Sequence, residues 1–188
     1  MSASDAELDM YNELTNIGAG NAATALSQML NERVDIGLPE AIELSLGDLE
    51  GIVGGSESGV VTMVLINVQG ELAGSIALVL DPPDHYLKAL QVPEEFADSA
   101  LGEIGNIFGA QFLIAMGRMA NLTGEVEPPA VGHGPRNAIL ETVIALAAES
   151  EPFYVLQMAL KMGDHESEAQ LLYFPAEQTL DNLRELLR

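Results

Sequence analysis

ELTNIGAGNAATALSQML at residues 13–30 and EIGNIFGAQFLIAMGRMA at residues 103–120 are two versions of one pattern. A constant offset of 90 residues relates them, and it extends beyond the quoted stretches in both directions. The matched pairs are Asp9 with Ser99, Glu13 with Glu103, Asn16 with Asn106, Ile17 with Ile107, Met29 with Met119, and Pro39 with Pro129. Because the offset holds without a gap, we interpret the chain as an internal repeat.

Apolar residues recur every three to four positions in both copies, which predicts long helices at residues 5–31 and 95–121. Each helix is followed by a strand beside a proline, then by a two-stranded hairpin and a short helix. The expected strands are 34–38, 60–68, 72–80, 125–131, 153–162 and 169–174, the short helices are 83–90 and 175–187, and residues 136–148 are expected to add a further strand. These patterns predict one α+β domain over residues 1–188, with pseudo-two-fold symmetry between repeat one (about 5–92) and repeat two (about 95–188).

Composition excludes several classes of protein. The chain has 188 residues, of which 48% are hydrophobic, so it can bury a core as a folded domain. It contains no cysteine, which excludes disulfides and thiolate chemistry. The first residues, MSASDAELDMYNEL, do not resemble a signal peptide, and we find no uninterrupted apolar run near the length of a membrane helix. We therefore expect a cytoplasmic protein that does not interact with a membrane.

The charge balance is strongly acidic. Lysine and arginine number 7 against 29 aspartates and glutamates, a formal net charge of −22. Such a chain repels the phosphate backbone, so we expect no nucleic-acid partner. Dense carboxylates keep a protein hydrated where salt screens their mutual repulsion. We interpret the charge as adaptation to high salt, that is, as a halophilic feature.

A stripe of polar residues runs along each predicted long helix. Asp9, Glu13 and Asn16 are spaced i, i+4 and i+7, which places them on one helix face. The stripe of Ser99, Glu103 and Asn106 has the same spacing. Glycines accompany both stripes although glycine inside a helix costs about 1 kcal/mol relative to alanine. They are Gly18 and Gly20 in the first copy, and Gly102, Gly105 and Gly109 in the second. Two explanations stay open: close approach of a partner protein, or close helix packing inside the domain.

Two other kinds of site receive little support from the sequence. Residues 18–23 fit the dinucleotide signature G-x-G-x-x-A, but the residues before them are typical of a helix rather than a strand, and the second copy lacks the signature. His85, His133 and His165 show no metal-ligand spacing, so we interpret them as isolated surface or loop residues. We expect no metal site and no cofactor of the protein's own.

The doubled motif resembles that of the CheC, CheX and FliY chemotaxis phosphatases, whose pattern is Asp/Ser-x3-Glu-x2-Asn-x22-Pro. The chain carries this pattern as Asp9, Glu13, Asn16 and Pro39, and again as Ser99, Glu103, Asn106 and Pro129. The resemblance covers essentially the whole chain. It implies two long helices on one face of an extended, mainly antiparallel sheet, with one active site on each helix.

The resemblance also implies an activity, which is removal of the phosphoryl group from the aspartyl phosphate of a CheY-like response regulator. The catalytic residues would be Glu13, Asn16, Glu103 and Asn106. Each asparagine would orient the attacking water, and each glutamate would meet a lysine of the regulator. The regulator would supply Mg²⁺ and the phosphoryl group. Asp9 and Ser99 would support the helix or contact the partner, and both prolines are expected to shape a strand.

A non-catalytic function is the alternative. Flagellar switch proteins of the FliM type share the implied fold without the motif, and CheC proteins also bind the deamidase CheD. The chain could therefore be an adaptor or switch-type binding module that acts through CheD or the motility motor. Because both Glu/Asn pairs are present, we favour the phosphatase and expect CheD as a second partner.

Overall fold

The computed structural model describes residues 5–37, 40–44, 59–81, 84–147, 153–162 and 168–186. Its helices are α1 (Asp5–Leu30), α2 (Asp84–Leu90), α3 (Ala97–Ala120), α4 (Arg136–Ala147) and α5 (Glu177–Glu185), with a 3₁₀ turn at Glu94–Phe96. Its strands are β1 (Val34–Ile36), β2 (Glu40–Leu44), β3 (Val60–Gly70), β4 (Gly74–Asp81), β5 (Gly124–Val126), β6 (Ala130–Pro135), β7 (Phe153–Met162) and β8 (Glu168–Pro175). The predicted α+β fold class is confirmed, and the two long helices end within two residues of their predicted limits.

The described strands form one antiparallel sheet in the order β1-β7-β8-β4-β3-β5, with β2 also on β7 and β6 also on β3. β4 and β8 meet at the centre, and the arrangement on one side mirrors that on the other. The first-half strands β1 and β2 pair with second-half β7, and the second-half strands β5 and β6 pair with first-half β3. This pairing has pseudo-two-fold symmetry, whereas duplication of the sequence stays an inference from the matched residues.

The sequence-based prediction is wrong at residues 136–148, which form helix α4 rather than a strand. Ile139 and Val143 lie four residues apart and are both buried against the sheet, which is helical spacing. The predicted strand at 125–131 is instead two strands, β5 and β6, separated by Pro128 and Pro129. Proline has no amide hydrogen to donate, so the pair interrupts the ladder. Strand β2 was not predicted.

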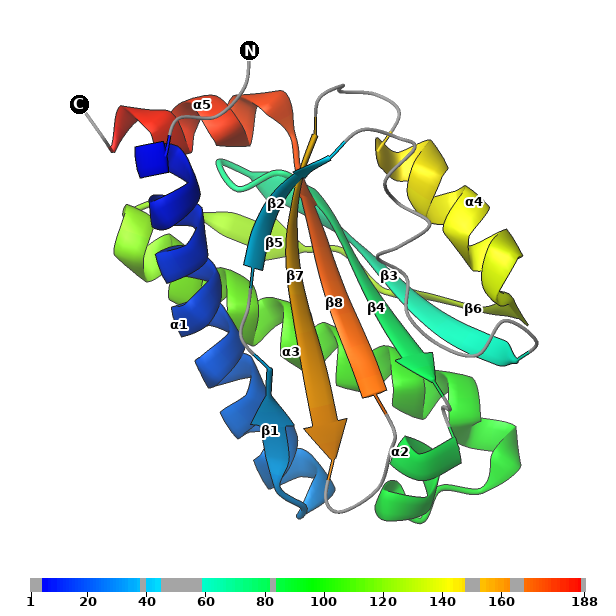
Figure 1. Ribbon diagram of the computed structural model, residues 1–188. Helices are drawn as coiled ribbons and strands as arrows, with labels where there is room; N and C mark the ends of the chain where they lie inside the picture. The colour runs from blue at the N-terminus through cyan, green and yellow to red at the C-terminus, as the bar shows by residue number, and fades with distance from the viewer. Residues whose placement is uncertain are drawn as a thin grey trace.

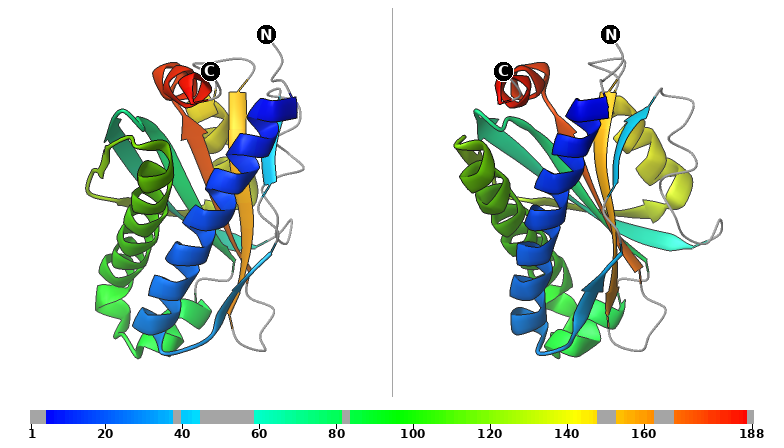
Figure 2. Two further views of the ribbon diagram at one scale, coloured as in Figure 1. Left: turned by 90° about the vertical axis from the view of Figure 1, so that its left-hand side faces the viewer. Right: turned by 60° about the vertical axis from the view of Figure 1, so that its left-hand side comes forward.

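Alternating residues of the central strands face two separate cores. Helices α1 and α3 lie side by side on one face of the sheet, and α4 covers part of the other (Figures 1 and 2). The α1/α3 core contains Val64, Ile66, Ile76, Leu78, Leu171 and Tyr173. The α4 core contains Val61, Met63, Ala77, Val79, Leu172 and Phe174. Both faces of the central strands are therefore apolar, and one of them is the surface against which the long helices pack.

The helix at Glu94–Ala120 is apolar and long enough to span a membrane by length and composition alone, although it contains no uninterrupted apolar run of that length. In the fold, 61% of its most apolar window is buried, as in the core helix of a soluble protein. Both long helices stop at an asparagine in the left-handed conformation, Asn31 (φ 50°) and Asn121 (φ 53°). Asparagine tolerates this conformation better than most residues and ends a helix well.

Close packing inside the domain explains most of the glycines in the long helices. A Cβ on Gly18 would lie 2.5 Å from the Phe112 ring, so α1 and α3 approach closely there. A Cβ on Gly105 would lie 2.5 Å from Cγ1 of Val64, and one on Gly109 would lie 3.0 Å from Ile66. Internal packing explains these three. Gly20 differs, because an added Cβ would meet no described atom within 4 Å.

We predict opposite effects on stability for alanine at two of these glycines. Gly105→Ala forces a methyl against the buried, branched Val64, and overpacking of this kind costs about 1–3 kcal/mol, more than the roughly 1 kcal/mol gained in helix propensity. Gly20→Ala meets no obstacle and should raise the free energy of unfolding by about 1 kcal/mol. Denaturant titrations measure both. Destabilisation by Gly20→Ala, or stabilisation by Gly105→Ala, would contradict the packing described.

Candidate functional site

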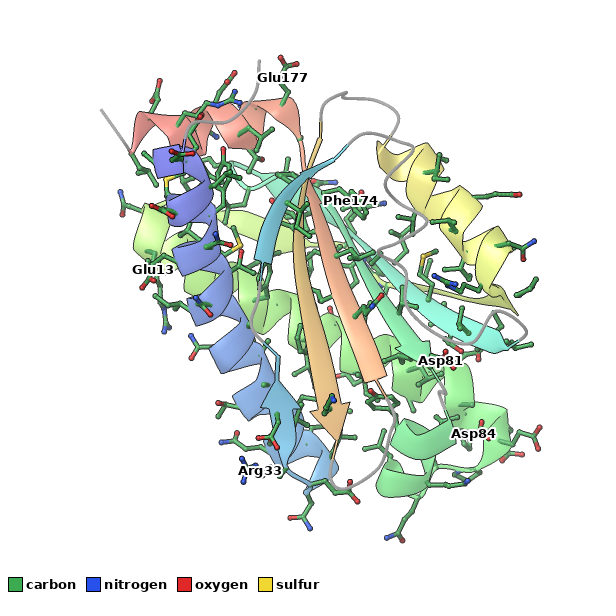
Figure 3. All side chains as sticks on the ribbon, viewed as in Figure 1. Glu13, Arg33, Asp81, Asp84, Phe174 and Glu177 are labelled. Carbon is green, nitrogen blue, oxygen red and sulfur yellow. The ribbon has the colours of Figure 1, made fainter. Side chains whose placement is uncertain are left out.

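The two polar stripes lie on the long helices, directed to solvent. Asp9, Glu13 and Asn16 are all exposed on α1. Figure 3 shows Glu13 on the side of α1 that is turned away from the sheet. Pro39, the proline of the first motif copy, lies outside the described residues. Gly20 lies one turn beyond Asn16 and is half-buried, and an added Cβ there would meet no described atom within 4 Å.

The second stripe lies in a groove of about 450 Å³ between α3 and the chain from β5 to β6. Its lining residues are Asp98, Ser99, Gly102, Glu103, Asn106, Val126, Glu127, Pro128, Pro129 and Val131. All four motif residues of the second copy therefore meet at one place, although Pro129 is distant from the others in sequence. Glu103 is exposed, whereas Asn106 is half-buried. The amide is thus partly removed from water while the carboxylate projects into it.

Backbone spacing and side-chain packing shape this groove. A Cβ on Gly102 would be in ordinary contact with Pro129 at 3.5 Å and Val131 at 3.6 Å, so the proline lies against α3 at this turn. The opposite wall is fixed through Thr123, whose hydroxyl (2.8 Å) and amide (2.9 Å) donate hydrogen bonds to Glu71. The hydroxyl bond, followed by the amide bond, lowers the pKa of Glu71. The turn from β3 to β4 therefore fixes the start of β5, and this contact helps to set the position of the groove wall that follows β5.

Carboxylates dominate the charge in the groove. Asp98, Glu103 and Glu127 line it, and Gln69 donates a hydrogen bond to Glu127. Within the described part of the chain, no group of three or more His, Asp or Glu residues is arranged to hold a metal ion. An acidic groove of this shape attracts a cationic side chain such as lysine. It also offers an amide, that of Asn106, next to the place where such a side chain would sit.

His133 contacts a residue that lines the groove, and no pattern in the sequence indicated this contact. His133 is not isolated, because its Nδ1 lies 2.8 Å from Thr62 Oγ1 and its Nε2 lies 2.8 Å from Asp98 Oδ1. Thr62, His133 and Asp98 come from β3, β6 and α3, so no local pattern could have revealed the contact. Thr62 is fully buried and cannot reach a substrate. His165 lies outside the described residues, and His85 lies on α2.

The dinucleotide signature at residues 18–23 lies in the middle of α1. A nucleotide-binding loop needs a strand directly before it and a helix that begins at it. Gly18 instead contacts Phe112 of the neighbouring helix. The structural context for dinucleotide binding is therefore missing, as the sequence predicted.

Comparison with known proteins identifies relatives of the same kind. The model of the "CheC-like family" matches residues 7–43 and 96–133, which are the two motif regions. The chain is 26% identical to the CheY-P phosphatase CheC of Bacillus subtilis (strain 168), over 94% of this chain and 91% of that one.

Two solved structures share the fold. FliY of Thermotoga maritima aligns with a TM-score of 0.73 and 17% identity, over 98% of this chain and 97% of that chain. The CheX–CheY–BeF₃–Mg²⁺ complex of Borrelia burgdorferi contains a chain that aligns with a TM-score of 0.58 and 17% identity, over 89% of this chain and 98% of that one. The chain is therefore similar to the CheC-like family in both motif regions, and it shares its fold with the solved FliY structure.

Proposed function

We propose that the protein hydrolyses the aspartyl phosphate of a CheY-like response regulator in chemotaxis signalling. The observation that carries the proposal is the Glu/Asn pair present at the same place on both long helices, where each pair can enter a shallow site of another protein. The relative named as a CheY-P phosphatase and the CheX–CheY complex support the same class of partner. The substrate would be met in the cytoplasm, where such regulators act.

Each asparagine orients the attacking water. An amide has an acceptor oxygen and a donor nitrogen, so it can hold a water in line with phosphorus without serving as a base. A glutamine orients the attacking water in the same way in GTPases. Asn106 is half-buried in its groove, which reduces competition from bulk water, and Asn16 is more open. Hydrolysis then proceeds by positioning, with no covalent intermediate on this protein.

The glutamates hold the two proteins together. Glu13 and Glu103 lie one turn before the asparagines on the same helix face, so a carboxylate and an amide enter the partner together. Each glutamate forms an ion pair with the regulator's lysine and thereby sets the angle of the helix. Mg²⁺ belongs to the regulator as part of the substrate. Asp9 is the first residue of the stripe on α1 and Ser99 the first of the stripe on α3, and both contact the edge of the regulator's phosphorylation site.

A non-catalytic adaptor or switch-type module, acting through CheD or the motility motor, is the second candidate. A shared fold by itself implies no activity, so the fold is compatible with this candidate as well. The Glu/Asn pairs argue for the phosphatase, since an adaptor needs no amide at the same position in two helices. We propose CheD as a further partner on the family resemblance.

We predict that Asn16→Ala combined with Asn106→Ala abolishes dephosphorylation while the protein stays folded. Truncating these side chains should leave the core unchanged, because Asn16 is exposed and Asn106 is only half-buried. Each single variant should retain part of the rate, since two sites act independently. Phosphate release from a regulator charged with acetyl phosphate measures the rate, and a thermal melt checks the fold. A double variant with the original rate would show that the asparagines do not orient the water.

We predict that folding stability and phosphatase rate rise together with KCl toward molar concentration. At a net charge of −22 the chain repels itself and also the carboxylate-rich site of a phosphorylated regulator. The screening length falls from roughly 30 Å at 0.01 M salt to roughly 3 Å at 1 M, so both penalties shrink. Thermal melts and phosphate release across a KCl series measure the two trends. If the protein were most stable and fastest in dilute buffer, the halophilic interpretation would be contradicted, but the proposed phosphatase function would not.

A further inference from the structure

His133 connects the sheet to the first turn of α3. It lies on β6 directly opposite Thr62 of β3, in register. From there its ring reaches Thr62 Oγ1 on one side and Asp98 Oδ1 on the other, each at 2.8 Å. Asp98 is the second residue of α3, directly before Ser99, and it lines the groove. The histidine therefore joins a buried hydroxyl to the mouth of the second site.

Hydrogen-bonding chemistry gives this chain of contacts a direction. An ionised carboxylate only accepts hydrogen bonds, so Nε2 of His133 carries the hydrogen that is donated to Asp98. A hydroxyl can donate or accept, so Thr62 fits Nδ1 in either state of the ring. Thr62 is 0% exposed, and a buried hydroxyl without a partner is costly. The contact thus satisfies Thr62 and holds the imidazole ring in place.

The first turn of α3 has no side-chain cap at its N-terminus. The residue before it, Phe96, makes no side-chain capping hydrogen bond, and the Ala97 amide instead donates to the Glu94 carbonyl of the preceding 3₁₀ turn. Phe96 is itself 55% exposed and does not anchor the chain by burial. The contact of His133 with Asp98, a tether between β6 and α3, therefore adds a side-chain restraint to the turn that carries Ser99 and precedes Glu103.

The first copy holds its helix differently. The positions equivalent to Asp98 and His133 at the 90-residue offset are Leu8 and Glu43, which cannot form this pair. The first turn of α1 is instead tied to α5, where Arg184 Nε lies 2.7 Å from Glu7 Oε1. Removing His133 should therefore affect the second site and leave the first unchanged.

We propose that His133 is a positioning residue of the second site, which acts through Asp98 to hold Ser99 and Glu103 at the angle that a partner meets. Its effect on the rate rests on the proposed phosphatase function. Its effect on the helix does not, because the tether is a property of the free protein. The two effects can therefore be tested separately.

The first test is amide hydrogen exchange in the free protein. The amides of residues 102–104 bond to carbonyls of the first turn of α3, so they report its opening. His133→Ala should accelerate their exchange by about tenfold and leave the amides of α1 unchanged. His133→Gln should restore part of the protection, because an amide can also accept from Thr62 and donate to Asp98. Unchanged exchange at residues 102–104 in His133→Ala would overturn the proposal.

The second test uses the two sites as mutual controls. In an Asn16→Ala background only the second site is left, and there His133→Ala should lower the rate by about tenfold through misplacement of the helix. In an Asn106→Ala background the same change should leave the rate unaltered. Asp98→Ala should lower the second-site rate equally and add nothing to His133→Ala, because both break one tether.

Each contrary result has its own meaning. Equal losses in both backgrounds would indicate general destabilisation and overturn the positioning role. A double asparagine variant that keeps its activity would instead count against the proposed phosphatase mechanism, and the exchange experiment would still decide the role of His133.

Discussion

The pairing of β4 with β8 is the constraint on which the rest of the structure depends. These strands are in register from Gly74 opposite Pro175 to Asp81 opposite Glu168, and they join the two halves at the centre of the sheet. The outer strand of each hairpin then pairs with strands of the other half, β3 with β5 and β6, and β7 with β1 and β2. Neither half can satisfy its backbone hydrogen bonds alone, so we expect one cooperative unit.

This exchange of strands decides where the two sites lie. Both long helices are placed on the same face of the sheet, and their contact at Gly18 and Phe112 turns the polar stripes outward. The sites are nevertheless unequal in their surroundings. Asn106 is half-buried in a groove whose wall is held by Glu71 and Thr123, whereas Asn16 is exposed.

Short-range patterns in the sequence were sufficient for the helices and the motif, but not for contacts between distant segments. Apolar periodicity located α1 and α3, and the motif shared with the CheC, CheX and FliY proteins includes Pro129 with Ser99, Glu103 and Asn106, all of which line the groove. Residues 136–148 were assigned to a strand because alanine and β-branched residues occur in both kinds of element, and only burial of Ile139 and Val143 on the sheet selects the helix. The tether from Thr62 through His133 to Asp98 joins three elements, so no spacing in the sequence predicts it.

The central claim is that the stripes on α1 and α3 are the surfaces that a phosphorylated regulator contacts. Carbodiimide labelling of carboxylates, read by mass spectrometry, tests it directly in the presence of a CheY-like regulator charged with BeF₃⁻ and Mg²⁺. Glu13 and Glu103 are exposed in the free chain, as are Glu141 on α4 and Glu177 on α5, which serve as controls. Labelling of Glu13 and Glu103 should fall only with the charged regulator, while labelling of the two controls is unchanged. Protection of Glu141 or Glu177, with Glu13 and Glu103 labelled as before, would contradict it.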